Sequence, residues 1–173
     1  MSLRAAGRGG RVSALEDEVA ALFVEMRPAV LRYAASLGLG TTDAEDVAQD
    51  TFLALYRHLG AGKPRTNLRG WIFRVTHNLA LKRRAASGLA AEADLEGADP
   101  GPTPEDAAAA NQRQARLRAV VNALPERERQ CLYLRAEGLS YREIASALDI
   151  SLGTVALSLS RSLAKLSAVG ERD

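Results

Sequence analysis

The sequence predicts an all-α protein in which two small helical domains are joined by an acidic linker. Two observations lead to this fold class. Over most of the chain apolar residues recur every three or four positions, the spacing of one face of an α-helix. One central segment instead combines glycine, proline and carboxylates, a composition that breaks helices and cannot bury a core. We expect a first domain in residues 13–86, a flexible linker in residues 87–103 and a second domain in residues 104–168.

The first helix is predicted by a long apolar face, formed by Leu15, Val19, Leu22, Met26, Val30, Tyr33 and Leu37. Pro28 lacks the amide hydrogen that an interior helical residue donates, so it should kink this helix or divide it in two. Gly38 and Gly40 should end the helix. The basic stretch before residue 12 is expected to be a disordered tail.

The second helix is expected in residues 43–59, because Thr42 and Glu45 form a capping-box pattern before it and Gly60 follows it. Its inward face should consist of Ala44, Val47, Ala48, Thr51, Leu55 and Leu59. Its outer face mixes carboxylates, an amide and apolar groups, namely Asp43, Asp46, Gln49, Asp50, Leu53 and Tyr56. Such a mixture favours docking onto a basic protein surface, although Leu53 and Tyr56 could instead belong to the core.

A third helix is expected in residues 68–86, after a loop in residues 61–67. Its inward face should consist of Leu68, Ile72, Val75 and Leu79. The loop and the helix also interleave cations, aromatic rings and amides: Lys63, Arg65, Asn67, Arg69, Trp71, Phe73, Arg74, His77, Asn78, Lys82, Arg83 and Arg84. Phosphates attract cations and unstacked bases stack on flat rings, so this pattern favours single-stranded nucleic acid. The last cations also complement the helix dipole, which is a purely structural explanation for them.

The second domain should begin with a helix at Thr103 and Pro104, because threonine caps helices and proline suits their first position. Residues 139–166 predict a helix-turn-helix. Its elements are a capping box of Ser140 with Glu143, a turn at Asp149 and Ile150, and a second helix capped by Ser151. The second helix should bury Val155, Leu159, Leu163 and Leu166. Its opposite face should carry a polar stripe that could lie in a major groove, made of Thr154, Ser158, Arg161 and Lys165.

Composition and charge narrow the function. The 173 residues are 25% charged and 47% hydrophobic, as in a globular protein. Apolar runs are too short to span a membrane, and no secretion signal is recognisable. One cysteine, Cys131, and two histidines exclude an internal disulfide and the usual four-ligand zinc site. We expect no metal, no cofactor, no membrane insertion and a cytoplasmic location. Lys and Arg outnumber Asp and Glu by 13 to 8 in residues 1–84 and by 10 to 7 in residues 113–173, whereas residues 85–112 contain 0 against 6.

Three segments together resemble a known family. They are residues 43–56 (DAEDVAQDTFLALY), residues 68–80 (LRGWIFRVTHNLA), and residues 124–130 (LPERERQ) followed by the helix-turn-helix. In order and spacing they resemble the extracytoplasmic-function (ECF) sigma factors of bacterial RNA polymerase, over about residues 14–167. The resemblance implies a region 2 that opens the promoter −10 element and a region 4 that reads the −35 element. It implies core RNA polymerase, through its β′ clamp and β flap, promoter DNA and an anti-sigma factor as partners, with the free protein a monomer.

The resemblance also implies roles for individual residues. A core polymerase interface would contain Asp46, Gln49, Asp50, Leu53 and Tyr56. Contacts with the −10 element, including a loop that captures a flipped base, would come from Lys63, Arg65, Asn67, Trp71, Arg74, His77, Asn78, Lys82 and Arg83. The −35 element would be read by Gly153, Thr154, Ala156, Leu157, Ser158, Arg161 and Lys165. The acidic linker resembles the connector that threads the polymerase channel in this family.

The chain departs from the family at the second helix of the helix-turn-helix. Many members have Lys-Ser-Arg where this chain has Ala156, Leu157 and Ser158. The −35 interaction should therefore be weaker and less salt-dependent, or should rely on apolar contact with a thymine methyl. Lys82 stands where an aspartate is common, which adds positive charge near the −10 region.

Two other classes of protein remain as alternatives. A helix-turn-helix response regulator or repressor would share the C-terminal pattern, but the first domain lacks the phosphoacceptor or ligand-binding pattern of such regulators. An enzyme would need a phosphate loop, a metal-ligand cluster or a nucleophile with its base, and none is recognisable. We therefore expect a protein that is not an enzyme.

Overall fold

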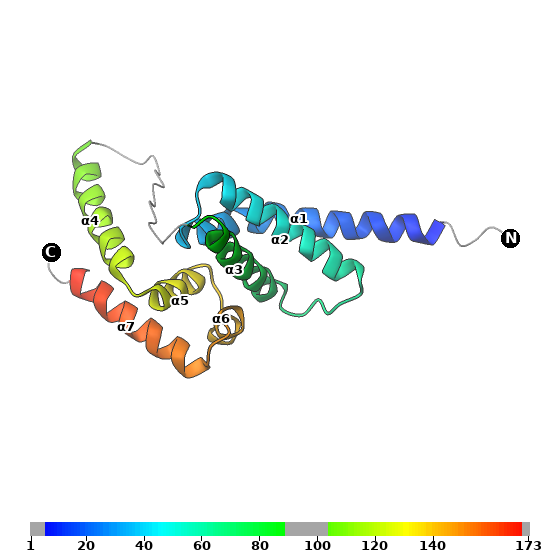
Figure 1. Cartoon of the computed structure of the whole chain (residues 1–173). Coiled ribbons are helices and arrows are strands. Elements are labelled where there is room, and N and C mark those ends of the chain that lie inside the picture. Colours follow the sequence, from blue (N-terminus) through cyan, green and yellow to red (C-terminus); the bar gives the residue numbers. More distant parts are fainter. Residues whose placement is uncertain (1–5, 89–103, 171–173) are drawn as a thin grey trace. The chain divides into compact units, whose positions relative to one another are not determined.

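The computed structural model describes residues 6–88 and 104–170, and over these ranges the chain forms seven α-helices and no β-strand (Figure 1). The all-α prediction is thus confirmed. The chain divides into two compact units, residues 1–92 and 93–173. The predicted linker lies mostly outside the described residues, as does Thr103. Within the described part, no single helix is long and apolar enough to cross a membrane.

The N-terminal unit contains α1 (Ala6–Ser36), α2 (Thr41–Gly60) and α3 (Leu68–Ala86), with α1 packed against α2 and α2 against α3. Its core is formed by large side chains with almost no exposed surface, among them Val30, Tyr33, Leu55, Ile72 and Phe73. Tyr33 and Phe73 meet edge to face, with ring centroids 5.7 Å apart. The face of α2 predicted to point inward is buried in full.

The C-terminal unit contains α4 (Pro104–Ala123), α5 (Glu126–Ala136), α6 (Tyr141–Leu148) and α7 (Leu152–Gly170). Helix α7 packs against α4, α5 and α6, and the core is centred on Leu134, Leu139, Ile144, Val155 and Leu159. The buried thiol of Cys131 also lies here, and its desolvation raises its pKa.

Helix α1 continues through Pro28, so of the two expected outcomes division does not occur and a kink stays a prediction. Val24, whose carbonyl loses its hydrogen bond there, is 76% exposed, so water can replace the bond. One expectation about this helix is wrong: it starts at Ala6, so the stretch expected to be a disordered tail is helical from that residue onward.

The capping box predicted for Thr42 and Glu45 does not form. Helix α2 already begins at Thr41, with Gly40 in extended backbone as its N-cap and no side-chain cap. The Glu45 carboxylate instead pairs with Arg27 of α1, with Oε1 2.5 Å from Nη2. By contrast, the residue limits predicted for α3 and the Ser140–Glu143 capping box of α6 are confirmed.

Candidate functional site

The outer face of α2 lies beside an apolar groove shared with α1. Leu53 is 48% exposed, Gln49 and Asp50 are exposed, and Tyr56 is half-buried. The groove has a volume of about 380 Å³ and is lined by Glu16, Val19, Ala20, Phe23, Gln49, Phe52, Leu53 and Tyr56. Phe23 and Phe52 form its floor edge to face, with centroids 5.1 Å apart. An apolar groove bordered by carboxylates is suited to docking a protein segment that carries cations.

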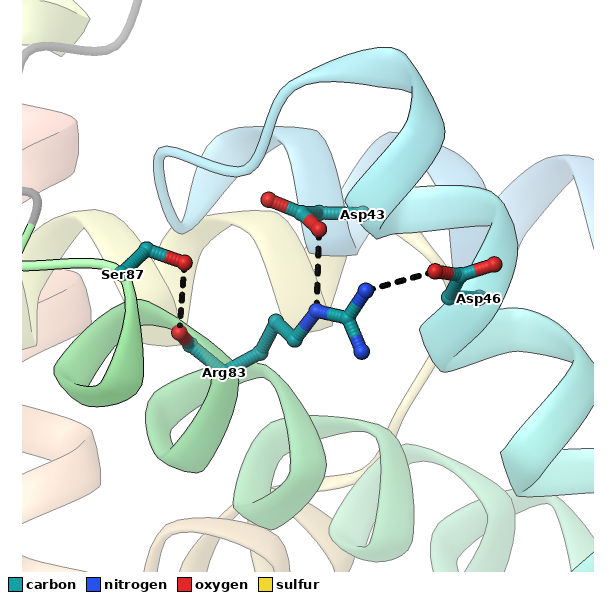
Figure 2. A network of polar contacts seen from close by, with 4 residues as sticks. All are labelled: Asp43, Asp46, Arg83 and Ser87. Carbon is teal, nitrogen blue, oxygen red and sulfur yellow. Dashed lines mark hydrogen bonds and ion pairs between the residues drawn. The ribbon is translucent and has the colours of Figure 1, made fainter.

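Arg83 connects α3 to the beginning of α2 (Figure 2). Its Nε donates to Asp43 Oδ1 at 2.9 Å, and its Nη2 donates to Asp46 Oδ2 at 2.6 Å. The hydrogen bond and charge of Asp43 raise the pKa of Arg83. At the same place the Ser87 hydroxyl donates to the Arg83 carbonyl oxygen at 3.0 Å, which closes the end of α3. A residue predicted to contact DNA and one predicted to contact polymerase are therefore bonded to each other.

The start of α3 is organised by Asn67. This residue has left-handed backbone (φ 56°), and its side-chain oxygen accepts the Gly70 amide at 3.1 Å, capping the helix. A Cβ at Gly70 would lie 2.6 Å from the Asn67 amide nitrogen, so the cap requires glycine there. The Asn67 side chain is thus already engaged in the fold.

Some of the residues predicted to contact nucleic acid are engaged within the fold, and others have exposed side chains. Arg65 makes a bidentate pair with Glu18 of α1, with Nε–Oε1 3.2 Å and Nη2–Oε2 3.0 Å. Arg83 pairs with Asp43 and Asp46 of α2. Trp71 is half-buried and packs against His58. The remaining predicted residues have exposed side chains, and they are Lys63, Arg74, Asn78 and Lys82.

His77 is not part of this surface, which corrects the prediction. It is 7% exposed, and its Nδ1 lies 2.9 Å from the hydroxyl of buried Tyr33. Phe73, one turn earlier, is fully buried as well. Both residues lie on the core face of α3, where an imidazole with a hydrogen-bond partner is tolerated. His77 therefore supports the fold, and DNA could reach it only after the core opened.

Helices α6 and α7 have the geometry of a helix-turn-helix. The chain bends by 107° between them, within the range of this motif. Asp149 makes the turn in left-handed backbone (φ 54°), and the Ser151 hydroxyl accepts the Thr154 amide at 3.1 Å. The predicted cap of the second helix is thus confirmed. The Thr154 hydroxyl also bonds Ser151, at 2.8 Å.

The polar stripe predicted along α7 is only partly exposed. Ser158 is 6% exposed, and Lys165 pairs with the buried Glu128 of α5 at 2.7 Å. Leu163, predicted to be buried, is 53% exposed. The core face follows positions i, i+3, i+4 and i+7 from Val155, through Ser158, Leu159 and Ser162. Serine fits inside because its hydroxyl can bond a backbone carbonyl, as Ser162 does with Ser158 at 2.8 Å.

The exposed side of α7 is consequently mostly apolar, and of its two cations, Arg161 and Lys165, the second is paired with Glu128. Leu157 is 51% exposed and Leu152 is 48% exposed, and Gly153, Ala156 and Arg161 are exposed beside them. In a helix-turn-helix the first turns of the second helix contact base edges. Leu152, Leu157 and Arg161 are the large exposed side chains of this part of α7.

Comparisons with known proteins agree with both units. Residues 22–88 match the family Sigma-70 region 2, and residues 114–166 match the family Sigma-70, region 4. The RNA polymerase sigma factor CnrH of Cupriavidus metallidurans is 33% identical over 157 residues, covering 84% of this chain and 82% of CnrH. The chain belongs to the ECF sigma factors of RNA polymerase.

Two further relatives extend this assignment. The ECF RNA polymerase sigma factor SigE of Mycolicibacterium smegmatis is 36% identical over 132 residues, covering 73% of this chain but 51% of that protein, so the match spans about half of SigE. A solved structure of CnrH in complex with the cytosolic domain of CnrY has a TM-score of 0.64 and 27% identity, and it covers 95% of each chain. Sigma factors are initiation factors of transcription, and this family membership replaces the alternative of a simple repressor.

Three residues that hold the sigma factor's candidate surfaces were not predicted from the sequence: Glu18, His58 and Glu128. Each lies on a helix other than the one it supports, so no local pattern marks it. A sequence feature marks Glu128 alone among the three. It stands with Glu126 in the first turn of α5, and it is the one of the two carboxylates that is buried.

Proposed function

We propose that this sigma factor directs promoter-specific initiation through three surfaces. The groove and outer face of α2 bind core polymerase, the loop and exposed side of α3 hold the opened −10 element, and the exposed side of α7 reads the −35 element. The observation that carries the proposal is the helix-turn-helix in region 4 together with a cation-rich α3 in region 2. The protein acts in the cytoplasm, free of enzymatic activity, and is a monomer when unbound.

Binding of core polymerase is assigned to Gln49, Asp50, Leu53 and Tyr56, with Asp46 at the edge. The groove beside these residues gives an apolar anchor, and the carboxylates give charge complementarity. Contacts with the β flap are assigned to region 4. The linker, residues 87–103, is proposed to follow the polymerase channel.

Promoter opening is assigned to the residues of α3 and its loop whose side chains can still contact DNA. Asn67 and Arg65 hold the conformation of the loop. Lys63, Arg74 and Lys82 supply charge for phosphates, and half-buried Trp71 and exposed Asn78 are the ring and the amide proposed to meet unpaired bases. Flipping a base costs a few kcal/mol of stacking, which a prepared pocket offsets. Arg83 contacts DNA only where it can exchange its carboxylate partners for phosphate.

Recognition of the −35 element is assigned to Arg161, Thr154, Gly153, Ala156 and Leu157. Ser158 and Lys165 contribute by holding α7 against α5. An anti-sigma factor is the proposed regulator, supported by the likeness to CnrH, which has been solved with the cytosolic domain of CnrY.

Run-off transcription with core RNA polymerase and a library of genomic fragments tests the proposal. The protein should direct initiation from a subset of fragments that share two short elements, whereas core alone should not. The chain with Asp50→Arg and Leu53→Ala is the matched negative control. A helix-turn-helix protein that binds these fragments but supports no initiation would contradict the proposal and favour a repressor.

A further inference from the structure

The loop in residues 61–67 is fastened to His58, in the last turn of α2, at two places. The Lys63 amide donates to the His58 carbonyl at 3.2 Å. The imidazole Nε2 of His58 lies 3.0 Å from the carbonyl oxygen of Pro64. Because a carbonyl oxygen only accepts, Nε2 must carry the hydrogen and donate it. One residue thus fixes two consecutive loop residues relative to α2.

The same imidazole packs against Trp71 in the first turn of α3. The ring centroids are 4.5 Å apart and the planes are inclined by 39°. Trp71 is the single tryptophan of the chain. His58 therefore connects the middle of the loop to the helix that follows it, and this link is independent of the Asn67 cap and of the pair between Arg65 and Glu18.

We propose that His58 is a positioning residue for the −10 element, which sets the loop so that an unpaired base is captured in one geometry. This inference rests on the proposed −10 role of the loop. Selection among bases requires polar groups held to within roughly 0.5 Å, and exposed loops reach that precision only when their backbone is supported. The bond to Pro64 orders the loop before DNA arrives, so binding does not incur that entropy cost.

Two variants separate the contacts of His58. His58→Phe keeps a flat ring beside Trp71 and removes the donor, whereas His58→Gln removes the ring and keeps an N–H donor at similar reach. Arg57→Gln, the neighbouring residue on the same exposed helix end, is the matched control. Each is assembled with core polymerase and tested on four single-stranded oligonucleotides that span the −10 element and differ only at the flipped base.

His58→Phe should reduce the preference for the cognate base about three- to tenfold, the effect of one lost hydrogen bond. His58→Gln and Arg57→Gln should stay within about twofold of the starting protein. Affinity for core polymerase and the helical circular dichroism signal should be the same in all four proteins, which shows that the fold is retained.

Undiminished base preference in His58→Phe would overturn the inference. A loss confined to His58→Gln would overturn it too, because it would assign the effect to ring packing against Trp71 and not to the bond with Pro64. If the starting protein itself showed no base preference, the proposed −10 role of the loop would fail instead. The two failures are thereby distinguishable.

Discussion

The two helices proposed to face DNA, α3 in region 2 and α7 in region 4, differ in how their cations are paired. Helix α3 and its loop carry many cations, of which Arg65 and Arg83 are paired with carboxylates of α1 and α2. Helix α7 carries two, Arg161 and Lys165, and Lys165 is bound to Glu128. The surface of α3 thus has further exposed cations besides the paired ones. The surface of α7 would depend on one arginine and on apolar side chains to bind DNA.

The difference teaches that a cation on a candidate surface has to be checked for a role in the fold before it is assigned to DNA. Glu128 is almost buried, so its charge needs the ammonium of Lys165 more than a surface carboxylate would. The pairs in region 2 are half exposed, and their partners can be exchanged at little cost. Region 2 cations can therefore serve both fold and function.

The largest effect is expected at the proposed polymerase-binding face of α2. Asp50→Arg with Leu53→Ala removes an apolar anchor and reverses a charge, and should weaken binding to core by about 30- to 100-fold. Fluorescence titration against core polymerase measures this. Val24→Ala, at an exposed apolar residue of α1 that does not line the groove, is the control and should bind normally. Unchanged affinity in a folded double variant would remove the α2 face from the polymerase interface.

The next largest effect distinguishes the structural role of His77 from the DNA-binding role proposed for its neighbour on α3, Asn78. His77→Ala should lower the free energy of unfolding by about 1–2 kcal/mol, because buried Tyr33 loses this hydrogen-bond partner. Asn78→Ala, at the exposed position, should change stability by less than about 0.5 kcal/mol and reduce opening of duplex promoters more than binding to pre-melted ones. Urea unfolding and open-complex assays measure the two. If His77→Ala kept its stability and was defective only in promoter opening, the structural role of His77 would be contradicted, and a contact with DNA would be favoured.

The helices could be predicted from sequence because apolar periodicity and caps are local. The limits of α3, the Ser140 capping box and the buried face of α2 follow from residues within one or two turns. The predicted face of α7 was wrong for a physical reason as well. Periodicity of apolar residues favoured Leu163 over Ser162, but a serine whose hydroxyl bonds backbone carbonyls can take a core position.

The site was less predictable than the fold, because its arrangement depends on partners distant in sequence. Arg65 and Glu18 are 47 positions apart, and Lys165 and Glu128 are 37 apart. Residue type alone identified these cations as candidates for DNA. Residue type does not tell which of these cations pairs with a carboxylate of another helix.

A smaller effect tests the apolar side of α7. If Leu157 contacts a thymine methyl, replacing that thymine by uracil should weaken −35 binding about fourfold, the value of one buried methyl group. Leu157→Ala should abolish the difference between thymine and uracil, and Leu163→Ala should leave it intact. Binding of a −35 duplex by the holoenzyme, with one thymine replaced at a time, measures it. A uracil penalty that persists in Leu157→Ala would assign the methyl contact to another residue.

The most direct test of the contrast between bound and available cations is the salt dependence of −35 binding in Arg161→Gln and Lys165→Gln. Both changes remove one positive charge from the same helix. Arg161→Gln should reduce the slope of log affinity against log salt by roughly one, or flatten the preference at one base pair if it reads a base. Lys165→Gln should leave slope and preference unchanged and lower the stability of region 4. A slope that falls by about one in Lys165→Gln would contradict the account, because Lys165 would then neutralise a phosphate in spite of Glu128.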